Sequence, residues 1–229
     1  MEDHIKRIVI DELSKLITDE RLALFHSKLN DKTQNLTIVL EDVFQSRNIN
    51  AVIRSSDCFG ISDVHLIENR NKFIIDQAVS LGAAKWTNII QHNKFDHNTE
   101  ICLNRLKGQG YKIIAAVPNK DANQLEDIDV KDKKTAILFG TELNGLSQKA
   151  LELSDKKMKI EMYGFTKSLN ISVAAGITLQ HLNHKIRKEN SSWKMRAEDK
   201  DNTLLKWLRN SIPHSGKIEK DIIKRFIKI

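Results

Sequence analysis

Short runs of β-branched and aliphatic residues alternate with longer helical patterns through the middle of this 229-residue chain. Helical spacing of apolar residues follows most of these runs and extends over a long final segment at 168–188. Parallel strands need crossover connections of this kind, so the pattern predicts an α/β fold with a mostly parallel sheet and helices on both faces. The predicted strands are 36–40, 64–67, 89–90, 112–117, 135–139 and 157–162. The predicted helices between them run from 49 to Gly60, from the second strand to about Gly82, over 98–107 and over 146–153.

The two ends of the chain have a different texture. Residues 5–29 place apolar side chains at helical spacing among charges, with no Gly or Pro to interrupt the pattern, which predicts an N-terminal helical arm. Within the core, residues 119–134 are polar and acidic, which predicts a loop or short turns rather than a core element. We therefore expect an N-terminal helical arm over 1–35, a core domain over 36–188 and a basic helical extension over 189–229.

Charge is unevenly distributed. The net charge is +7, and residues 183–229 hold 13 Lys and Arg against 6 Asp and Glu, whereas residues 1–182 hold 24 of each. A basic tail on a neutral body favours a polyanionic partner, because Lys and Arg beside phosphates release condensed counterions. Trp193 and Trp207 lie in this tail and are able to stack on bases. The alternative is a solvated charged helix whose apolar side chains, Trp207 among them, pack onto the body.

Several classes of protein fit the sequence poorly. The first residues mix acids and bases, and no stretch approaches the ~18 apolar residues of a membrane helix. Cys58 and Cys102 lack the paired spacing of a zinc site and are too few for a disulfide scaffold. The histidines show no clear metal spacing either. We expect a soluble cytoplasmic protein with no metal, no membrane and no secretion signal.

Three polar clusters each follow a predicted strand, at 48–55, 140–145 and 168–172. Open α/β sheets bind their ligands at the carboxyl ends of the strands, so these clusters should meet at one edge of one sheet. Each cluster alone is a weak signal. A lone Asn or Ser beside a helix start is more often an N-cap than a functional group.

Taken together and in order, the clusters resemble the three motifs of the SPOUT RNA methyltransferases, and within them the TrmH branch, which 2'-O-methylates ribose. The resemblance covers residues 36–182. It implies a deep trefoil knot at the C-terminal end of the sheet, S-adenosyl-L-methionine as cofactor and a homodimer. The helical flanks resemble those of the branch that methylates guanosine 18 in the tRNA D-loop, which implies tRNA as partner. The alternatives are ribose methylation of ribosomal RNA and a knotted RNA-binding protein without catalysis.

The resemblance also assigns the reacting group. It places Arg54 beside the ribose hydroxyl, where relatives are described as using a general base helped by an RNA phosphate. Because a guanidinium is effectively always protonated, we favour Arg54 as stabiliser of the forming alkoxide and clamp on the adjacent phosphate. The structural alternative is a surface ion pair with Asp57, one turn further along the helix.

The remaining site residues are carried over by motif position. Asn48 orients Arg54 or the ribose, or simply caps its helix, and Glu142 shapes the site around the substrate. Ser168 and Asn170 line the pocket between cofactor and RNA, or serve as a helix cap and a first-turn residue. The resemblance implies adenosine contacts at four positions, which are Ala116, Gly140, Ile160 and Leu169.

Overall fold

The computed structural model describes residues 1–73, 82–131 and 133–226. The chain divides into two compact units, one of residues 33–193 and one that joins residues 1–32 to 194–229. The two flanks, expected as separate arms, therefore pack with each other in one unit. Among the helices of the described residues, none is long and apolar enough to cross a membrane.

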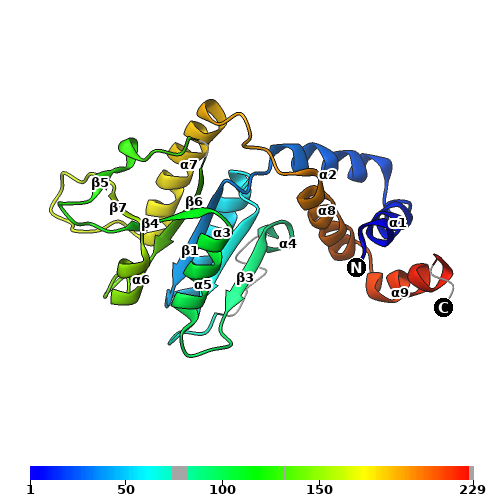
Figure 1. Ribbon diagram of the computed structural model, residues 1–229, viewed down its shortest axis with the longest axis horizontal. Helices are drawn as coiled ribbons and strands as arrows, with labels where there is room; N and C mark the ends of the chain where they lie inside the picture. Colours follow the sequence, from blue (N-terminus) through cyan, green and yellow to red (C-terminus); the bar gives the residue numbers. More distant parts are fainter. Residues whose placement is uncertain (74–81, 132, 227–229) are drawn as a thin grey trace. The chain divides into compact units, whose positions relative to one another are not determined.

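The unit of residues 33–193 is built on a parallel sheet (Figure 1). Its described residues form seven strands in the order β3-β2-β1-β6-β4-β7-β5, and every neighbouring pair is parallel. The prediction of an α/β fold with a parallel sheet is confirmed. The strands are β1 Leu36–Glu41, β2 Asp63–Ile67, β3 Asn88–His92, β4 Tyr111–Ala116, β5 Asn123–Gln124, β6 Lys134–Phe139 and β7 Lys156–Lys159.

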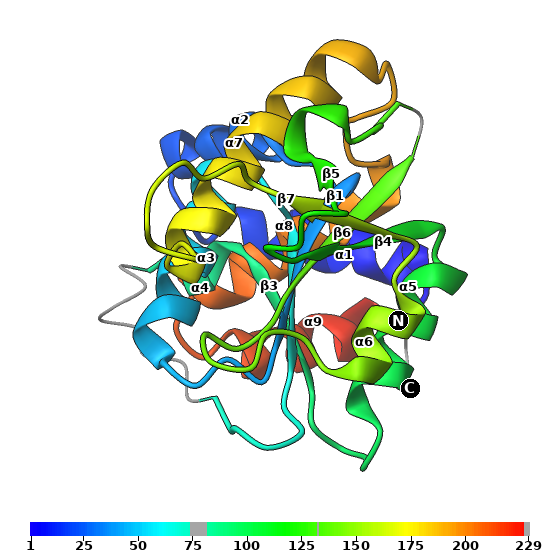
Figure 2. The same cartoon turned by 90° about the vertical axis from the view of Figure 1, so that its left-hand side faces the viewer.

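Helices cover both faces because successive side chains of each strand point to opposite sides. In β1, Ile38 and Leu40 join the cluster of buried residues that includes α3 and α7, whereas Val39 joins the cluster formed with α5. Figure 2 shows α3 and α7 on one side of the strands and α5 and α6 on the other. The helices of this unit are α3 Ser46–Cys58, α4 Ala83–Trp86, α5 Asn98–Gly108, α6 Gln148–Leu153 and α7 Ile171–Glu189, with a 3-10 turn at Leu125–Asp127.

Several predicted boundaries differ from the structure. The helix predicted up to Gly82 falls largely on residues 74–81, which lie outside the described residues. The described residues of 119–133 form the two-residue strand β5 and a 3-10 turn, as expected of short turn structure, but they are not outside the core. Leu125, Ile128 and Val130 are buried in the cluster beneath α7. Acidic neighbours at 126, 127 and 129 hid this alternation of buried and exposed positions.

The second unit consists of four helices in its described residues, namely α1 Asp3–Ser14, α2 Asp19–Asp31, α8 Ala197–Ser211 and α9 Ser215–Phe226. The helical pattern of residues 5–29 is divided between two helices. Thr18 breaks it by capping α2, where its side chain accepts a hydrogen bond from the Arg21 backbone N–H. Trp207 is buried with its ring edge-on to Phe25 at 5.5 Å between centroids, so it packs within this unit and is not exposed for base stacking.

Candidate functional site

The three predicted clusters meet through a chain of amide and carboxyl side chains. Asn48 Nδ2 donates to Glu142 Oε1 at 2.6 Å, and Asn170 Nδ2 donates to Asn48 Oδ1 at 3.2 Å. Asn170 Oδ1 in turn accepts from the backbone N–H of Ser172 at 2.9 Å. Residues separated by about a hundred positions in sequence are thus directly bonded, as the strand-end argument predicted.

Helix boundaries show which of these residues are helix caps. Helix α3 begins at Ser46, so Asn48 is its third residue rather than its N-cap, and its buried side chain is directed at Glu142. Helix α7 begins at Ile171, three residues later than predicted, and Asn170 is the N-cap. Ser168 is exposed in the preceding loop and is therefore not a helix cap.

Arg54 lies near the middle of α3, six residues beyond Asn48, with its side chain exposed. Its position is about 120° around the helix from Asn48, and it forms no hydrogen bond or ion pair with the residues that the structure describes. The alternative of an ion pair with Asp57 is therefore wrong for the described side chains. A guanidinium that is exposed and unpaired among the described residues is available to bind an anionic group.

The segment after β6 folds back on itself. Thr141 and Gly145 exchange backbone hydrogen bonds of 2.9 and 3.0 Å, which closes a tight loop that presents Glu142. Gly140 lies against the far end of this loop, and a Cβ there would come within 2.3 Å of the Gly145 carbonyl. Glycine is required at 140 for this close backbone approach, and at 145 for a positive φ of 67°.

Three of the four positions assigned to adenosine fall at one edge of the sheet. Ala116 ends β4, Gly140 follows β6 and Ile160 follows β7, and these three strands are neighbours in the order β6-β4-β7. Strand β7 ends at Lys159 rather than Met162, which leaves Ile160 in the connection that leads to the third cluster. Leu169 is 37% exposed at the end of that connection.

Two acidic residues at the end of β1, which the sequence did not single out, bond the segments that follow β6 and β2. Glu41, the last residue of β1, is 2% exposed and accepts hydrogen bonds from the backbone N–H and Oγ of Ser147 at 2.8 and 2.7 Å. Asp42 follows with a positive φ of 51°, and its carboxylate accepts from the backbone N–H groups of Asn69 and Arg70. An acid at the end of an apolar strand was the only signal of either role.

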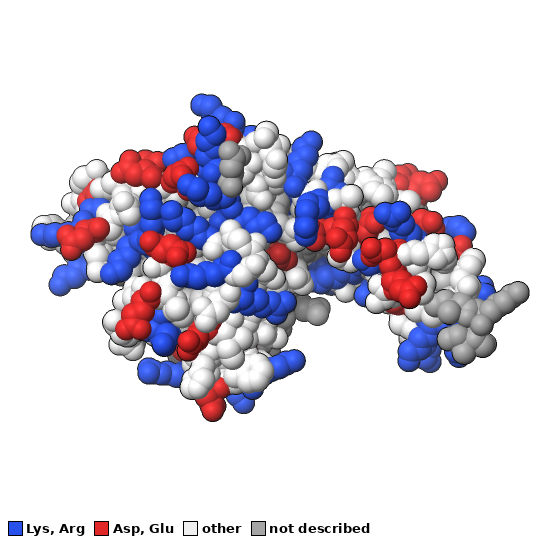
Figure 3. Space-filling model, in the orientation of Figure 1, with Lys and Arg blue, Asp and Glu red and all other residues white. Residues whose placement is uncertain are grey.

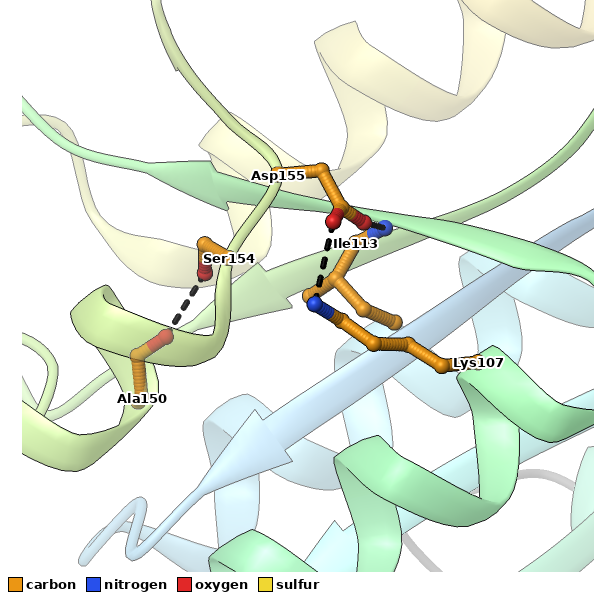
Figure 4. A network of polar contacts seen from close by, with 5 residues as sticks. All are labelled: Lys107, Ile113, Ala150, Ser154 and Asp155. Atoms are coloured by element: carbon orange, nitrogen blue, oxygen red, sulfur yellow. Dashed lines mark hydrogen bonds and ion pairs between the residues drawn. The ribbon is translucent and has the colours of Figure 1, made fainter.

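The opposite edge of the sheet has a polar network of its own (Figure 4). Asp155, just before β7, accepts from the backbone N–H of Ile113 at 2.8 Å and from Lys107 Nζ at 3.0 Å. Ser154 Oγ donates to the Ala150 carbonyl at 2.7 Å and closes the end of α6. These contacts join β4, α5 and α6 at the amino ends of the strands, away from the three clusters.

A cluster of His65, His92 and Cys102 holds three potential metal-binding atoms within 4.8 Å of one another. His65 Nδ1 and His92 Nε2 are 3.1 Å apart and hydrogen-bond each other. Burial lowers the pKa of His65 to about 3 and raises the pKa of the Cys102 thiol to about 12. The rings of His65 and His92 also stack, with 5.3 Å between their centroids, and we interpret this cluster as a buried packing contact.

Comparison with known proteins places the chain in a family. The model of the SpoU rRNA methylase family matches residues 35–180. The chain is 42% identical over 218 residues to the tRNA (guanosine(18)-2'-O)-methyltransferase of Borreliella burgdorferi, covering 95% of this chain and 97% of that protein. It is 32% identical to the enzyme of the same name from Thermus thermophilus, covering 71% and 81%. The crystal structure of the TrmH/SpoU tRNA modifying enzyme of Aquifex aeolicus matches with a TM-score of 0.75 at 27% identity, over 85% of this chain and 98% of that one. This chain therefore belongs to the SpoU methylase family.

Proposed function

We propose that this protein transfers a methyl group from S-adenosyl-L-methionine to the ribose 2'-hydroxyl of guanosine 18 in tRNA. The observation that carries the proposal is the bonded set Glu142–Asn48–Asn170 at the carboxyl edge of the sheet, with the unpaired Arg54 on the same helix as Asn48. The relative from Borreliella burgdorferi, which is named for this reaction, matches 95% of this chain, flanks included, and this favours tRNA over ribosomal RNA.

The roles of the side chains follow from their chemistry. A ribose hydroxyl attacks only as its proton leaves, so negative charge grows on its oxygen during the reaction. Arg54 stabilises that charge and binds the neighbouring phosphate, since a guanidinium keeps its proton throughout. Asn48 and Asn170 fix the wall of the site from two helices, and Glu142 holds Asn48 in place. Ser168 is exposed in the connection between β7 and α7, where it contacts the RNA.

The four positions Ala116, Gly140, Ile160 and Leu169 suit S-adenosylmethionine. The loop that begins at Gly140 brings backbone groups to the surface with no side chain at 140 in the way. The other three positions supply small or apolar contacts for an adenine ring. When bound, the cofactor supplies an electrophilic methyl group on a sulfonium. Two homologous-fold crystal structures, of an rRNA methyltransferase from Sinorhizobium meliloti and of AviRb from Streptomyces viridochromogenes, contain this cofactor, which supports the proposal.

We further propose that the connection from β6 to α7 is threaded as a trefoil knot, a known exception to unthreaded chains. The strand order supports it: β7 pairs with β4, yet the next helix, α7, packs against β1 and α3. Residues 36–188 would then carry the methyl transfer, with the flanking helices of 1–35 and 189–229 assisting in RNA binding. We place the protein in the cytoplasm, where its tRNA substrate is modified.

A homodimer is the proposed assembly. The helical stripe of Ile171, Ala175 and Leu179 is buried against the protein's own sheet, so it is not the dimer surface. A second stripe on the outer side holds Leu169, Val173 and Ile177, which are 37 to 48% exposed, and the exposed Tyr163 and Phe165 lie just before it. An apolar stripe of this kind matches a self-complementary interface. Ile177→Glu should convert dimer to monomer in analytical ultracentrifugation, and an unchanged mass would move the interface elsewhere.

The reaction is tested with isotopically labelled S-adenosylmethionine and two tRNA transcripts that differ only in carrying guanosine or 2'-deoxyguanosine at position 18. We expect label in the first and none in the second. Arg54→Ala should lower the rate about 100-fold or more while calorimetric binding of the cofactor stays near wild type. Arg54→Lys keeps the charge but loses the planar, two-pronged donor group of the guanidinium. Its rate should lie between those of wild type and Arg54→Ala. Equal label in both transcripts would refute the proposal, as would label that appears only in ribosomal RNA offered in a parallel reaction.

A further inference from the structure

Glu41 links the segment that leads to the first cluster, at 48–55, with the end of the loop that carries the second cluster, at 140–145. It is the last residue of β1, seven residues before Asn48, and its carboxyl group is almost completely buried. Three donors contact that group, which are Ser147 N, Ser147 Oγ and Thr99 Oγ1, at 2.8, 2.7 and 2.6 Å. A buried carboxyl group with three close donors stabilises the elements that supply the donors.

Ser147 is the point where the loop of residues 140–146 rejoins the body. Its Oγ donates to Glu41 and also accepts from the Ala150 backbone N–H at 3.1 Å, so it caps α6. Leu146, directly before it, is buried. The loop is therefore held at one end by β6 and at the other by the contact between Ser147 and Glu41.

The same two segments also meet at their functional ends. Glu142 at the exposed side of the loop bonds Asn48, and Gly140 at its start packs against Gly145. Two contacts therefore join the segment 41–48 to the segment 142–147. One is the bond between Glu41 and Ser147 beneath the loop, and the other is the bond between Asn48 and Glu142 at the site. We therefore expect a change at Glu41 or Ser147 to displace both Gly140 and Glu142.

We propose that Glu41 is a positioning residue for methyl transfer, which acts through Ser147 to hold the 140–146 loop in the geometry that binds cofactor and supports Asn48. This inference rests on the proposed function of the same site. Glu41 itself is buried beneath the loop and does not contact the reacting groups.

The test is Glu41→Gln, which keeps the shape but places an amide donor against the Ser147 donors. We expect KM for S-adenosylmethionine to rise and kcat to fall, with kcat/KM reduced about 10- to 100-fold, the range for a lost hydrogen bond to a charged group. Ser147→Ala should give a smaller loss of the same kind, and the double variant should lose no more than Glu41→Gln alone.

Two variants serve as matched controls. Thr99→Val removes the third donor to Glu41 without touching the loop, and Asp155→Asn weakens a carboxylate junction at the opposite edge of the sheet. Both should keep KM and kcat within about twofold of wild type when rates are corrected for folded fraction by circular dichroism.

The outcomes are distinguishable. A wild-type protein without methyl transfer refutes the proposed function itself. If the wild type is active and Glu41→Gln has the same kcat and KM as Asp155→Asn, the positioning role is overturned. It is also overturned if the losses of Glu41→Gln and Ser147→Ala add fully in the double variant. If Glu41→Gln does not fold, Ser147→Ala decides the question, because an unchanged KM for the cofactor in that variant also refutes the inference.

Discussion

At the scale of single residues, Asn48 shows how one amide can link segments that are distant in sequence. Its Nδ2 donates to Glu142 while its Oδ1 accepts from Asn170, so both polar ends of the side chain are satisfied by the other two clusters. An aspartate at this position could not donate to Glu142, and an alanine would leave two partners unbonded. The amide is therefore the side chain that this three-way contact requires.

The buried histidine pair makes stability depend on pH. Burial, then His92 and Arg105, lower the pKa of His65 to about 3, and burial and Arg105 lower that of His92. In the unfolded chain these histidines bind protons as the pH falls through about 6.5, whereas in the folded chain they stay neutral. Their contribution to the free energy of unfolding is therefore complete above pH 6.5 and is lost as the pH decreases toward 3. At pH 5, His65 alone should cost about 2 kcal/mol of the free energy of unfolding in urea. His65→Gln should remove much of this dependence of the free energy of unfolding on pH, whereas the exposed control His184→Gln should not. Equal dependence on pH in both variants would contradict the role of the buried pair.

At the scale of elements, the loop of residues 140–146 depends on glycine for space. A Cβ on Gly140 would lie 2.3 to 2.4 Å from the backbone of Gly145 and Leu146, and backbone atoms cannot move aside as a flexible side chain can. Gly140→Ala should therefore open the pair between Thr141 and Gly145, weaken binding of S-adenosylmethionine at least tenfold and destabilise the fold by about 1 to 3 kcal/mol.

The control for this substitution is Gly108→Ala at the end of α5, where an added Cβ meets no atom within 4 Å. That variant should bind cofactor as wild type does, with unchanged or slightly higher stability. Calorimetric titration and thermal unfolding measure both quantities. Wild-type binding by Gly140→Ala would show that the loop tolerates the added methyl group.

Elements with a strong period were predictable and contacts between them were not. Strands β1, β4 and β6 were predicted to within one residue or two at either end, because each is a run of buried aliphatic residues. The bonded set of Asn48, Glu142 and Asn170 was expected only as residues at one edge, since a sequence pattern fixes the strand end but not the partner. The junction of Glu41 with Ser147 gave no periodic signal, and the buried residues of 119–134 were hidden by acidic neighbours.

At the scale of the whole molecule, Lys and Arg occur in two settings. In Figure 3 many of them gather over β4, β5 and β7, with acidic side chains interspersed. This agrees with the near balance of charge in residues 36–182, which hold 18 basic and 17 acidic residues. In residues 183–229 the basic residues outnumber the acidic ones, at 13 against 6, so we expect more phosphate contacts there, each of which releases condensed counterions.

Helix α9 provides the sharpest test of this difference. Lys217, Lys220 and Lys224 are exposed on it, while Ile222 is buried within its unit, so replacing the three lysines by Gln removes charge and leaves the helix packed. Each phosphate contact contributes about 0.7 to 0.9 to the slope of log K against log salt, so the triple variant should flatten that slope for tRNA by up to about 2 to 3. The matched variant neutralises the exposed Lys120, Lys131 and Lys157 of the sheet unit and should change the slope less. Equal slopes in both variants would assign the tail to packing alone, because its excess charge would then play no part in holding RNA.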